Sequence, residues 1–175
     1  MASISQFKSA LKGGGARSNR FETLIEFPSF AAGSDTIRKT PFLCSSSQLP
    51  GSNLGVIEHP FRGRTLKLAG DRTFDEWTVS FVNDLDFDLR NAFELWQNGI
   101  NGYNSNTGFV VPDDYMATVS IYQLDNKDNR VKAYTMKLAW PSVVAPIEVA
   151  QDSNDQIELF EVTFVYSDIS NGSST

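Results

Sequence analysis

The sequence predicts a mainly β protein, an antiparallel β-sandwich or barrel with one α-helix packed at its side. Three observations support this fold class. About seven segments alternate apolar and polar residues, one segment repeats its apolar residues at helical spacing, and strands do not alternate with helices along the chain. The 175 residues, 41% of them hydrophobic, suffice for one core, so a single domain is expected over residues 1–175.

The first twenty residues are predicted to form a basic N-terminal arm. Ile4, Phe7 and Leu11 fall at helical spacing, and the glycines at 13–15 then end any helix. Four basic side chains and no acidic ones occur in this segment, namely Lys8, Lys12, Arg17 and Arg20. We therefore expect a short helix on a flexible joint over residues 1–20.

Period-two alternation predicts the strands. The first begins at Phe21 and is closed by Pro28. The alternation is strongest where Trp77, Val79 and Phe81 share one face. In chain order, the expected strands are 21–27, 39–47, 61–68, 73–82, 115–124, 131–140 and 157–166.

One segment changes to helical periodicity. Its apolar residues recur at the spacing that places them on one stripe, and they are Leu85, Leu89, Ala92, Phe93 and Trp96. Asn83 or Asp84 is the expected N-cap, and Gly99 is the expected stop. This is the only clear helix that we expect against the core.

Turn and breaker residues divide the remaining chain. Residues 48–55 are rich in Pro, Gly and Asn, which predicts a loop or an irregular hairpin tip. The polar turn 125–130 should join two strands into a hairpin, and Pro141 and Pro146 should interrupt the chain after it. The small, polar tail 167–175 is expected to fray.

Composition excludes several classes of function. The chain carries 21 acidic and 15 basic side chains, and its net charge of −6 opposes tight binding to nucleic acid. No apolar run reaches the roughly 20 residues of a membrane-spanning helix, so we expect a soluble protein whose monomer does not insert into membranes. Cys44 and His59 are the only cysteine and histidine, too few for a disulfide or a Cys/His metal cage. We therefore assign no catalytic residue, no metal and no cofactor.

Two acidic clusters match calcium loops only in part. Residues 84–88 lack the required glycine, and position twelve is Leu95, so these carboxylates are interpreted as charges at the positive end of the helix dipole. The second cluster comprises Asp152, Asp155 and Glu158. A solvated turn is favoured there, and a calcium-dependent β-sandwich binding module is kept as the alternative function of another class.

The most distinctive segment is 69–79, AGDRTFDEWTV, in which charged residues crowd the entrance to a strand. It resembles the strand-entry motif of the tail tube proteins of contractile-tailed phages of the T-even type. Further positions similar to that family are Ala16 to Asn19, Asn83-Asp84, Trp96-Gln97, Trp140-Pro141 and the closing strand from Asn154 to Thr163. The resemblance covers nearly the whole chain, and the departures from it lie at 13–15, 31–35 and 99–108.

The resemblance implies two packed β-sheets with one helix, six subunits per ring, and rings stacked inside a contractile sheath. The inner sheets of neighbouring subunits would join into one continuous barrel lining the channel, through which DNA passes without binding. The implied partners are further copies of the chain, the tail sheath protein, and baseplate and tail terminator proteins. The implied setting is the virion tail, assembled in the host cytoplasm, and no enzymatic activity is expected. A tube-initiating baseplate protein and the tube of a phage-derived contractile injection system remain as alternatives.

The resemblance and the charge pattern also suggest which residues face other subunits. The inter-subunit candidates are Arg17, Gly51, Asn53, Glu58, Arg62, Arg64, Asp71, Arg72, Asp75 and Glu76. The candidates for the lumen are Thr65, Lys67, Thr118, Ser120, Thr135 and Lys137. The loop from Gln48 to His59 is expected to reach beyond its own subunit and to lock one ring onto the next.

Overall fold

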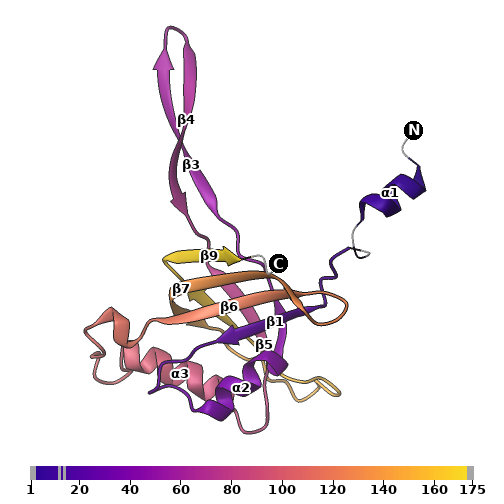
Figure 1. The fold of residues 1–175 in the computed structure, drawn as a ribbon. Helices are drawn as coiled ribbons and strands as arrows, with labels where there is room; N and C mark the ends of the chain where they lie inside the picture. The colour runs from indigo at the N-terminus through magenta and orange to yellow at the C-terminus, as the bar shows by residue number, and fades with distance from the viewer. Residues whose placement is uncertain (1–2, 12, 14, 173–175) are drawn as a thin grey trace.

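The computed structural model describes residues 3–11, 13 and 15–172, and its fold is mainly β (Figure 1). The helices are α1 (Ile4–Ala10), α2 (Ser34–Leu43) and α3 (Asp88–Ile100), with a short 3-10 helix, η2, at Pro112–Asp114. The strands are β1 (Phe21–Ile25), β2 (Cys44–Ser47), β3 (Asn53–Phe61), β4 (Arg64–Thr73), β5 (Trp77–Val82), β6 (Ala117–Leu124), β7 (Arg130–Val144), β8 (Leu159–Val165) and β9 (Asp168–Gly172). None of the described helices has the length and apolar character needed to span a membrane.

Two antiparallel sheets share the long strand β7. Its first part pairs with β6 and β9, which gives a first sheet in the order β1–β6–β7–β9. Its last part pairs with β8, which gives a second sheet in the order β7–β8–β5–β2. The change of sheet follows Leu138, whose φ of 54 lies in the left-handed region. The described strands form a sandwich and do not close into a barrel within the subunit, so the barrel alternative does not hold for one chain.

The core fills the space between the sheets and α3. The predicted alternation is confirmed in β5 and β8, whose aromatic residues face inward and are fully or almost fully buried. The ring of Phe93 lies 5.0 Å from that of Phe27 and 5.5 Å from that of Phe81, measured between centroids. The indole of Trp96 donates a hydrogen bond to the carbonyl of Tyr115 at 2.7 Å, so burial leaves no unpaired N–H there.

Three element predictions near the helices are wrong. The extended run expected over 39–47 is helical up to Leu43, because α2 packs Ile37 against the core and buries Thr40 despite an internal proline. Helix α3 begins at Asp88 with Phe87 as N-cap, and Leu85 is 97% exposed, so neither Asn83 nor Asp84 caps it. The sandwich therefore has two flanking helices and not one.

The loop predicted over 48–55 is wrong in its second half. Asn53 already belongs to β3, which pairs with β4 along its whole length, and the hairpin turns at Arg62 and Gly63 with φ values of 48 and 81. Gly55 and Gly70 face one another across the strands, where a Cβ on Gly70 would lie 3.1 Å from a backbone carbon of Gly55. The glycine is thus needed for close backbone approach and not for a turn.

The C-terminal half mostly follows the prediction. Strands β6 and β7 form the expected hairpin around the 125–129 turn. Strand β7 continues through Pro141 to Val144, with a register shift after the proline, so Pro141 does not end it. The expected fraying of 167–175 is wrong for Asp168–Gly172, which pairs with β7 as β9, and residues 173–175 lie outside the described part.

Candidate assembly surfaces

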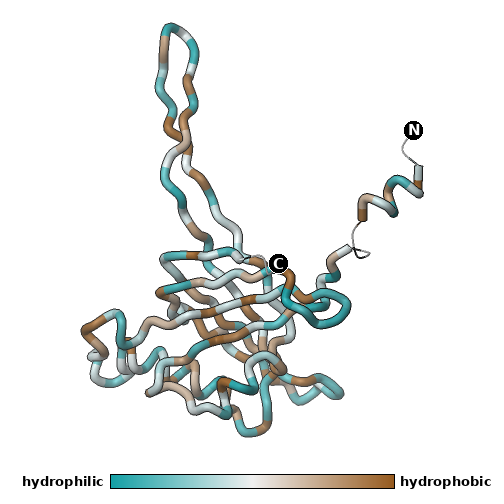
Figure 2. The backbone as a smooth tube through the Cα atoms, viewed as in Figure 1, coloured by the Kyte–Doolittle hydropathy of each residue, from teal (hydrophilic) through white to brown (hydrophobic). Residues whose placement is uncertain are grey.

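The β3–β4 hairpin projects far from the sandwich and carries exposed apolar residues along its length (Figures 1 and 2). Cross-strand pairing places Ile57 opposite Leu68, and His59 opposite Leu66, on one face. Phe61 completes that apolar face and is 62% exposed, and Leu66 is 54% exposed. Large apolar side chains left in water on a two-stranded ribbon point to a partner surface, since such a ribbon is marginal in water by itself.

The opposite face of the hairpin is more polar. There Glu58 lies opposite Lys67, and their charged groups are 3.2 Å apart, while Thr65 lies opposite Pro60. The predicted contact residues Arg62 and Arg64 lie at the exposed tip and at the start of β4. The structure thus brings three charged inter-subunit candidates, Glu58, Arg62 and Arg64, together at the outer half of the hairpin.

Four further candidates gather at the base of the hairpin. The amide of Asn53 donates to both carboxylate oxygens of Asp75 at 2.9 Å. The guanidinium of Arg72 donates to the hydroxyl of Ser52 at 3.0 Å, next to Gly51. The first bonds tie β3 to the segment that enters β5, and the second ties β4 to the segment that enters β3, so both hold the base of the hairpin.

The lumen candidates divide between two places. Thr118 and Ser120 alternate with core residues of β6, and Thr135 and Lys137 flank buried Met136 in β7, so these four side chains share the outer face of the first sheet. The hydroxyl of Ser120 donates to that of Thr135 at 3.2 Å across the strands. Thr65 and Lys67 lie on the hairpin instead and do not belong to this face.

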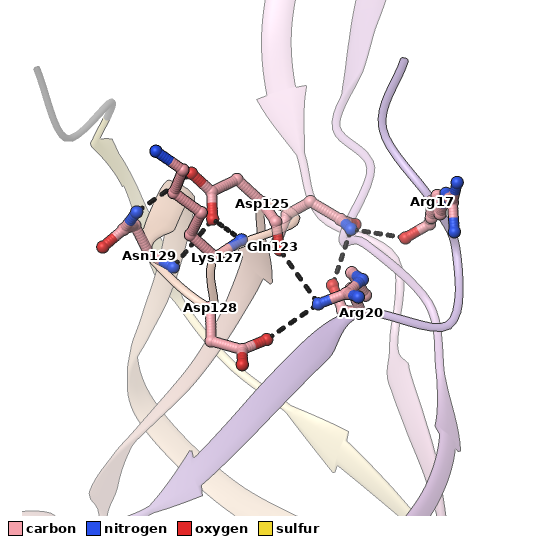
Figure 3. Close-up of polar contacts among 7 residues, drawn as sticks. All are labelled: Arg17, Arg20, Gln123, Asp125, Lys127, Asp128 and Asn129. Atoms are coloured by element: carbon pink, nitrogen blue, oxygen red, sulfur yellow. Dashed lines mark hydrogen bonds and ion pairs between the residues drawn. The ribbon is translucent and has the colours of Figure 1, made fainter. Parts of the chain in front are cut away.

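A polar anchor at the β6–β7 turn holds the root of the N-terminal arm (Figure 3). The side-chain amide of Gln123 donates to the carbonyls of Arg17 and Arg20, at 2.8 and 2.6 Å. Asp125 accepts from the side chain and backbone of Asn129 and from the backbone of Lys127, and these bonds hold the pKa of its carboxyl below the usual range. Arg17 is the one inter-subunit candidate that lies here, and Lys12 falls outside the described residues.

Among the described residues, the lone histidine and the lone cysteine lie on different elements. His59 lies on the β3–β4 hairpin. Cys44 is the first residue of β2 and directly follows α2. The sulfur of Cys44 is 3.4 Å from the hydroxyl of Thr23, and burial raises the pKa of the thiol above its usual value, with the Thr23 contact acting in the opposite direction. A thiol with a raised pKa is a poor nucleophile at neutral pH.

The two acidic clusters differ in how their carboxylates are placed. Among the described residues, the one group of three possible ligands close enough to share an ion is Asp84, Asp86 and Asp88. The ammonium of Lys39 lies 2.6 Å from Asp88 and 3.1 Å from Asp84, and these two contacts raise the pKa of Lys39 above its usual range. The sequence did not identify Lys39 as the residue that pairs with these two carboxylates. Glu158 of the second cluster instead accepts a hydrogen bond from Asn83 at 2.9 Å.

Comparison with known proteins identifies relatives along the whole chain. A family model described as phage tail tube protein matches residues 16–170. The tail tube protein of Serratia phage KSP90 is 34% identical over 168 residues, which is 95% of either chain. The tail tube protein of Enterobacteria phage T4 is 34% identical over 123 residues, covering 70% of this chain and 76% of that one.

Solved structures show the same fold at lower identity. A chain of the sheath–tube complex of an extracellular contractile injection system, in its extended state, superposes with a TM-score of 0.63 at 16% identity and covers 99% of this chain and 100% of that one. A chain of the anti-feeding prophage baseplate superposes with a TM-score of 0.64 at 18% identity, covering 90% and 95%.

Proposed function

Because the chain belongs to the phage tail tube protein family, we propose that its copies assemble as stacked hexameric rings into the inner tube of a contractile phage tail. The observation that carries this proposal is that both end strands of the first sheet lack a strand partner on one side. Among the described residues, β1 pairs only with β6 and β9 pairs only with β7, although Thr23 and Ile25 of β1 are fully buried within the subunit. Open edges invite pairing with another chain, and a ring closes them all.

The two edges are complementary in direction. Each step from β1 to β6, β7 and β9 is antiparallel, so β9 runs opposite to β1. The β9 edge of one copy can therefore extend the sheet antiparallel onto the β1 edge of the next copy. This head-to-tail contact uses two different surfaces, as a closed ring requires.

The hydrogen bonds between β1 and β6 show which backbone groups of β1 point away from β6. The N–H of Glu26 donates to the carbonyl of Thr118 at 3.0 Å, and the N–H of Leu124 donates to the carbonyl of Arg20 at 3.0 Å. Since pairing alternates along an antiparallel strand, the intervening even-numbered residues bond to β6 as well. The backbone groups of residues 21, 23 and 25 then point away from β6. Thr23 and Ile25 are fully buried within the subunit, so Phe21, which is half-buried, is the residue of this set most accessible to the next copy.

In such a ring the outer face of the first sheet lines the channel. Thr118, Ser120 and Thr135 contribute uncharged hydroxyl groups to the middle of this face. The one basic residue of the set, Lys137, lies opposite Asp168 of β9. A wall with few unpaired positive charges does not retain a passing polyanion, so DNA moves through without binding. The hairpin, with Asp71 and Arg72 in its final strand, reaches the next ring.

The remaining partners follow from the family. We propose contacts with the tail sheath protein on the outside of the tube, with baseplate proteins at one end and with a tail terminator at the other. Assembly takes place in the host cytoplasm, and the subunit catalyses no reaction. The relatives with 34% identity are tail tube proteins, which favours the tube over a tube-initiating baseplate role for this chain.

Amide hydrogen exchange tests the edge pairing. We expect the amide of Phe21 to exchange at least about tenfold more slowly in assembled rods, the tubes of stacked rings, than in the free subunit, because the neighbour supplies the missing acceptor. The amides of Glu22 and Leu24 are the internal control, since they bond to β6 in both states. Equal exchange of the Phe21 amide in rods and free subunits contradicts the proposed ring contact.

A further inference from the structure

The described root of the N-terminal arm is hydrogen-bonded to the domain. Its root is held by Gln123, which binds the carbonyls of Arg17 and Arg20, and by Asn126, whose amide donates to the carbonyl of Gly13 at 3.3 Å. Only residues 11 and 12 separate this anchored stretch from the end of α1. Figure 1 shows α1 on the far side of the arm's root, away from the segment that joins β7 to β8.

Helix α1 presents an apolar stripe to solvent. Ile4 is 77% exposed, Phe7 65% and Leu11 41%, and α1 buries none of its residues. Ser3 and Gln6 form a capping box, so the helix start is specified by sequence. A seven-residue helix is marginal in water, and its apolar stripe gains stability only by packing against a surface.

A groove with matching chemistry lies between β8 and the segment that precedes it. Its volume is about 780 Å³, and the lining includes Val149, Ile157 and Leu159, which are 80%, 74% and 51% exposed. Three glutamates also line it, Glu148, Glu158 and Glu161. The lining itself contains no Lys or Arg, and Arg90 lies beside it against Ala145 and Phe160, so the groove combines apolar surface with net negative charge.

We propose that the arm of one copy docks into this groove of a second copy, with the stripe of Ile4, Phe7 and Leu11 on the apolar floor. Lys8 follows Phe7 on α1 and is exposed, so it can approach Glu148 at the rim. The arm carries only positive charge and the groove only negative charge, which favours this pairing over groove–groove or arm–arm contacts. The anchored root directs the helix to another copy and not to its own groove. This inference rests on the proposed self-assembly.

Cross-linking between two single-cysteine chains tests the docking. In a Cys44→Ser background, Lys8→Cys and Glu148→Cys are placed on separate chains, mixed, assembled, and treated with a short bismaleimide. We expect a covalent dimer that contains one chain of each kind. The matched control pairs Lys8→Cys with Asp113→Cys, since Asp113 is an exposed carboxylate outside the groove, and no dimer is expected.

Two results of the cross-linking experiment would contradict the proposed docking. Rods that give no dimer overturn it, and so does a chain carrying both cysteines that cross-links only within itself, because the arm then occupies its own groove. Rods from the unsubstituted chain are verified first, and their absence contradicts the proposed function and not merely the docking.

A second variant examines the apolar stripe. Phe7→Ala is expected to lower the cross-linked fraction about tenfold at limiting concentration, as loss of a buried phenyl group predicts. Ser9→Ala on the same helix is the control and should change it little. Equal yields from the two variants overturn packing of the stripe in the groove.

Discussion

Replacing residues 54–72 by a short Asn-Gly turn is expected to leave a folded subunit that no longer forms rods. The two residues that flank the replaced segment, Asn53 and Thr73, pair with each other across the strands, so a tight turn can join them. The hairpin contributes none of the buried core residues, so β-type circular dichroism and thermal stability of the remaining domain should change little. The apolar face that we propose to contact the next ring is lost entirely, so stacking should stop.

Point substitutions separate the two faces of the hairpin. Leu66→Asp places a charge on the apolar face, and Thr65→Asp places the same charge on the opposite face one residue away. We expect the first to abolish rods, since an unpaired charge in an interface costs several kcal/mol, and the second to permit them. Rods of normal length from the shortened chain would assign ring stacking elsewhere, with the N-terminal arm as the next structure to examine.

Phe93→Ala is expected to destabilise the subunit by about 3–5 kcal/mol. Its ring is fully buried and lies within 6.2 Å, centroid to centroid, of the rings of Phe27, Phe81, Phe160 and Phe164. A loss of this size is a large part of the 5–15 kcal/mol that holds a typical domain folded. Urea denaturation measures it.

The matched control for Phe93 lies on the same helix. Leu95 is 52% exposed on the outer side of α3, and Leu95→Ala should change the free energy of unfolding by less than about 0.5 kcal/mol. Comparable losses from the two substitutions would contradict the placement of the core between the two sheets and α3.

The sequence predicts elements well where one face is buried. In β5, β8 and α3 the apolar residues meet the core at regular spacing, so alternation and helical periodicity identify them. The hairpin has no buried face within the subunit, and its glycines suggested a loop although they lie inside paired strands. Helix α2 was missed because Pro41 and two threonines oppose helix formation, and only tertiary packing of Ile37 and Thr40 overrides them.

Assembly surfaces are predictable to a similar extent. Alternation alone places Thr118 and Ser120 on the sheet face that points away from the core, and the structure joins them there to Thr135 and Lys137, although Ser120 is only 5% exposed. The anchor of Gln123 and Asp125 could not be found from spacing, because its bonds reach residues 17 and 20, more than 100 positions away. The pairing of Lys39 with Asp84 and Asp88 spans 45 and 49 positions, so spacing along the chain could not reveal it either.

Electron microscopy of the concentrated, purified protein tests the central claim most directly. The account predicts hollow rods built of sixfold rings, in which a continuous barrel of first sheets lines the channel and the β3–β4 hairpins lie between rings. Particles that remain monomeric at every concentration, or rods whose walls place the α3 side of the sandwich toward the channel, would contradict it.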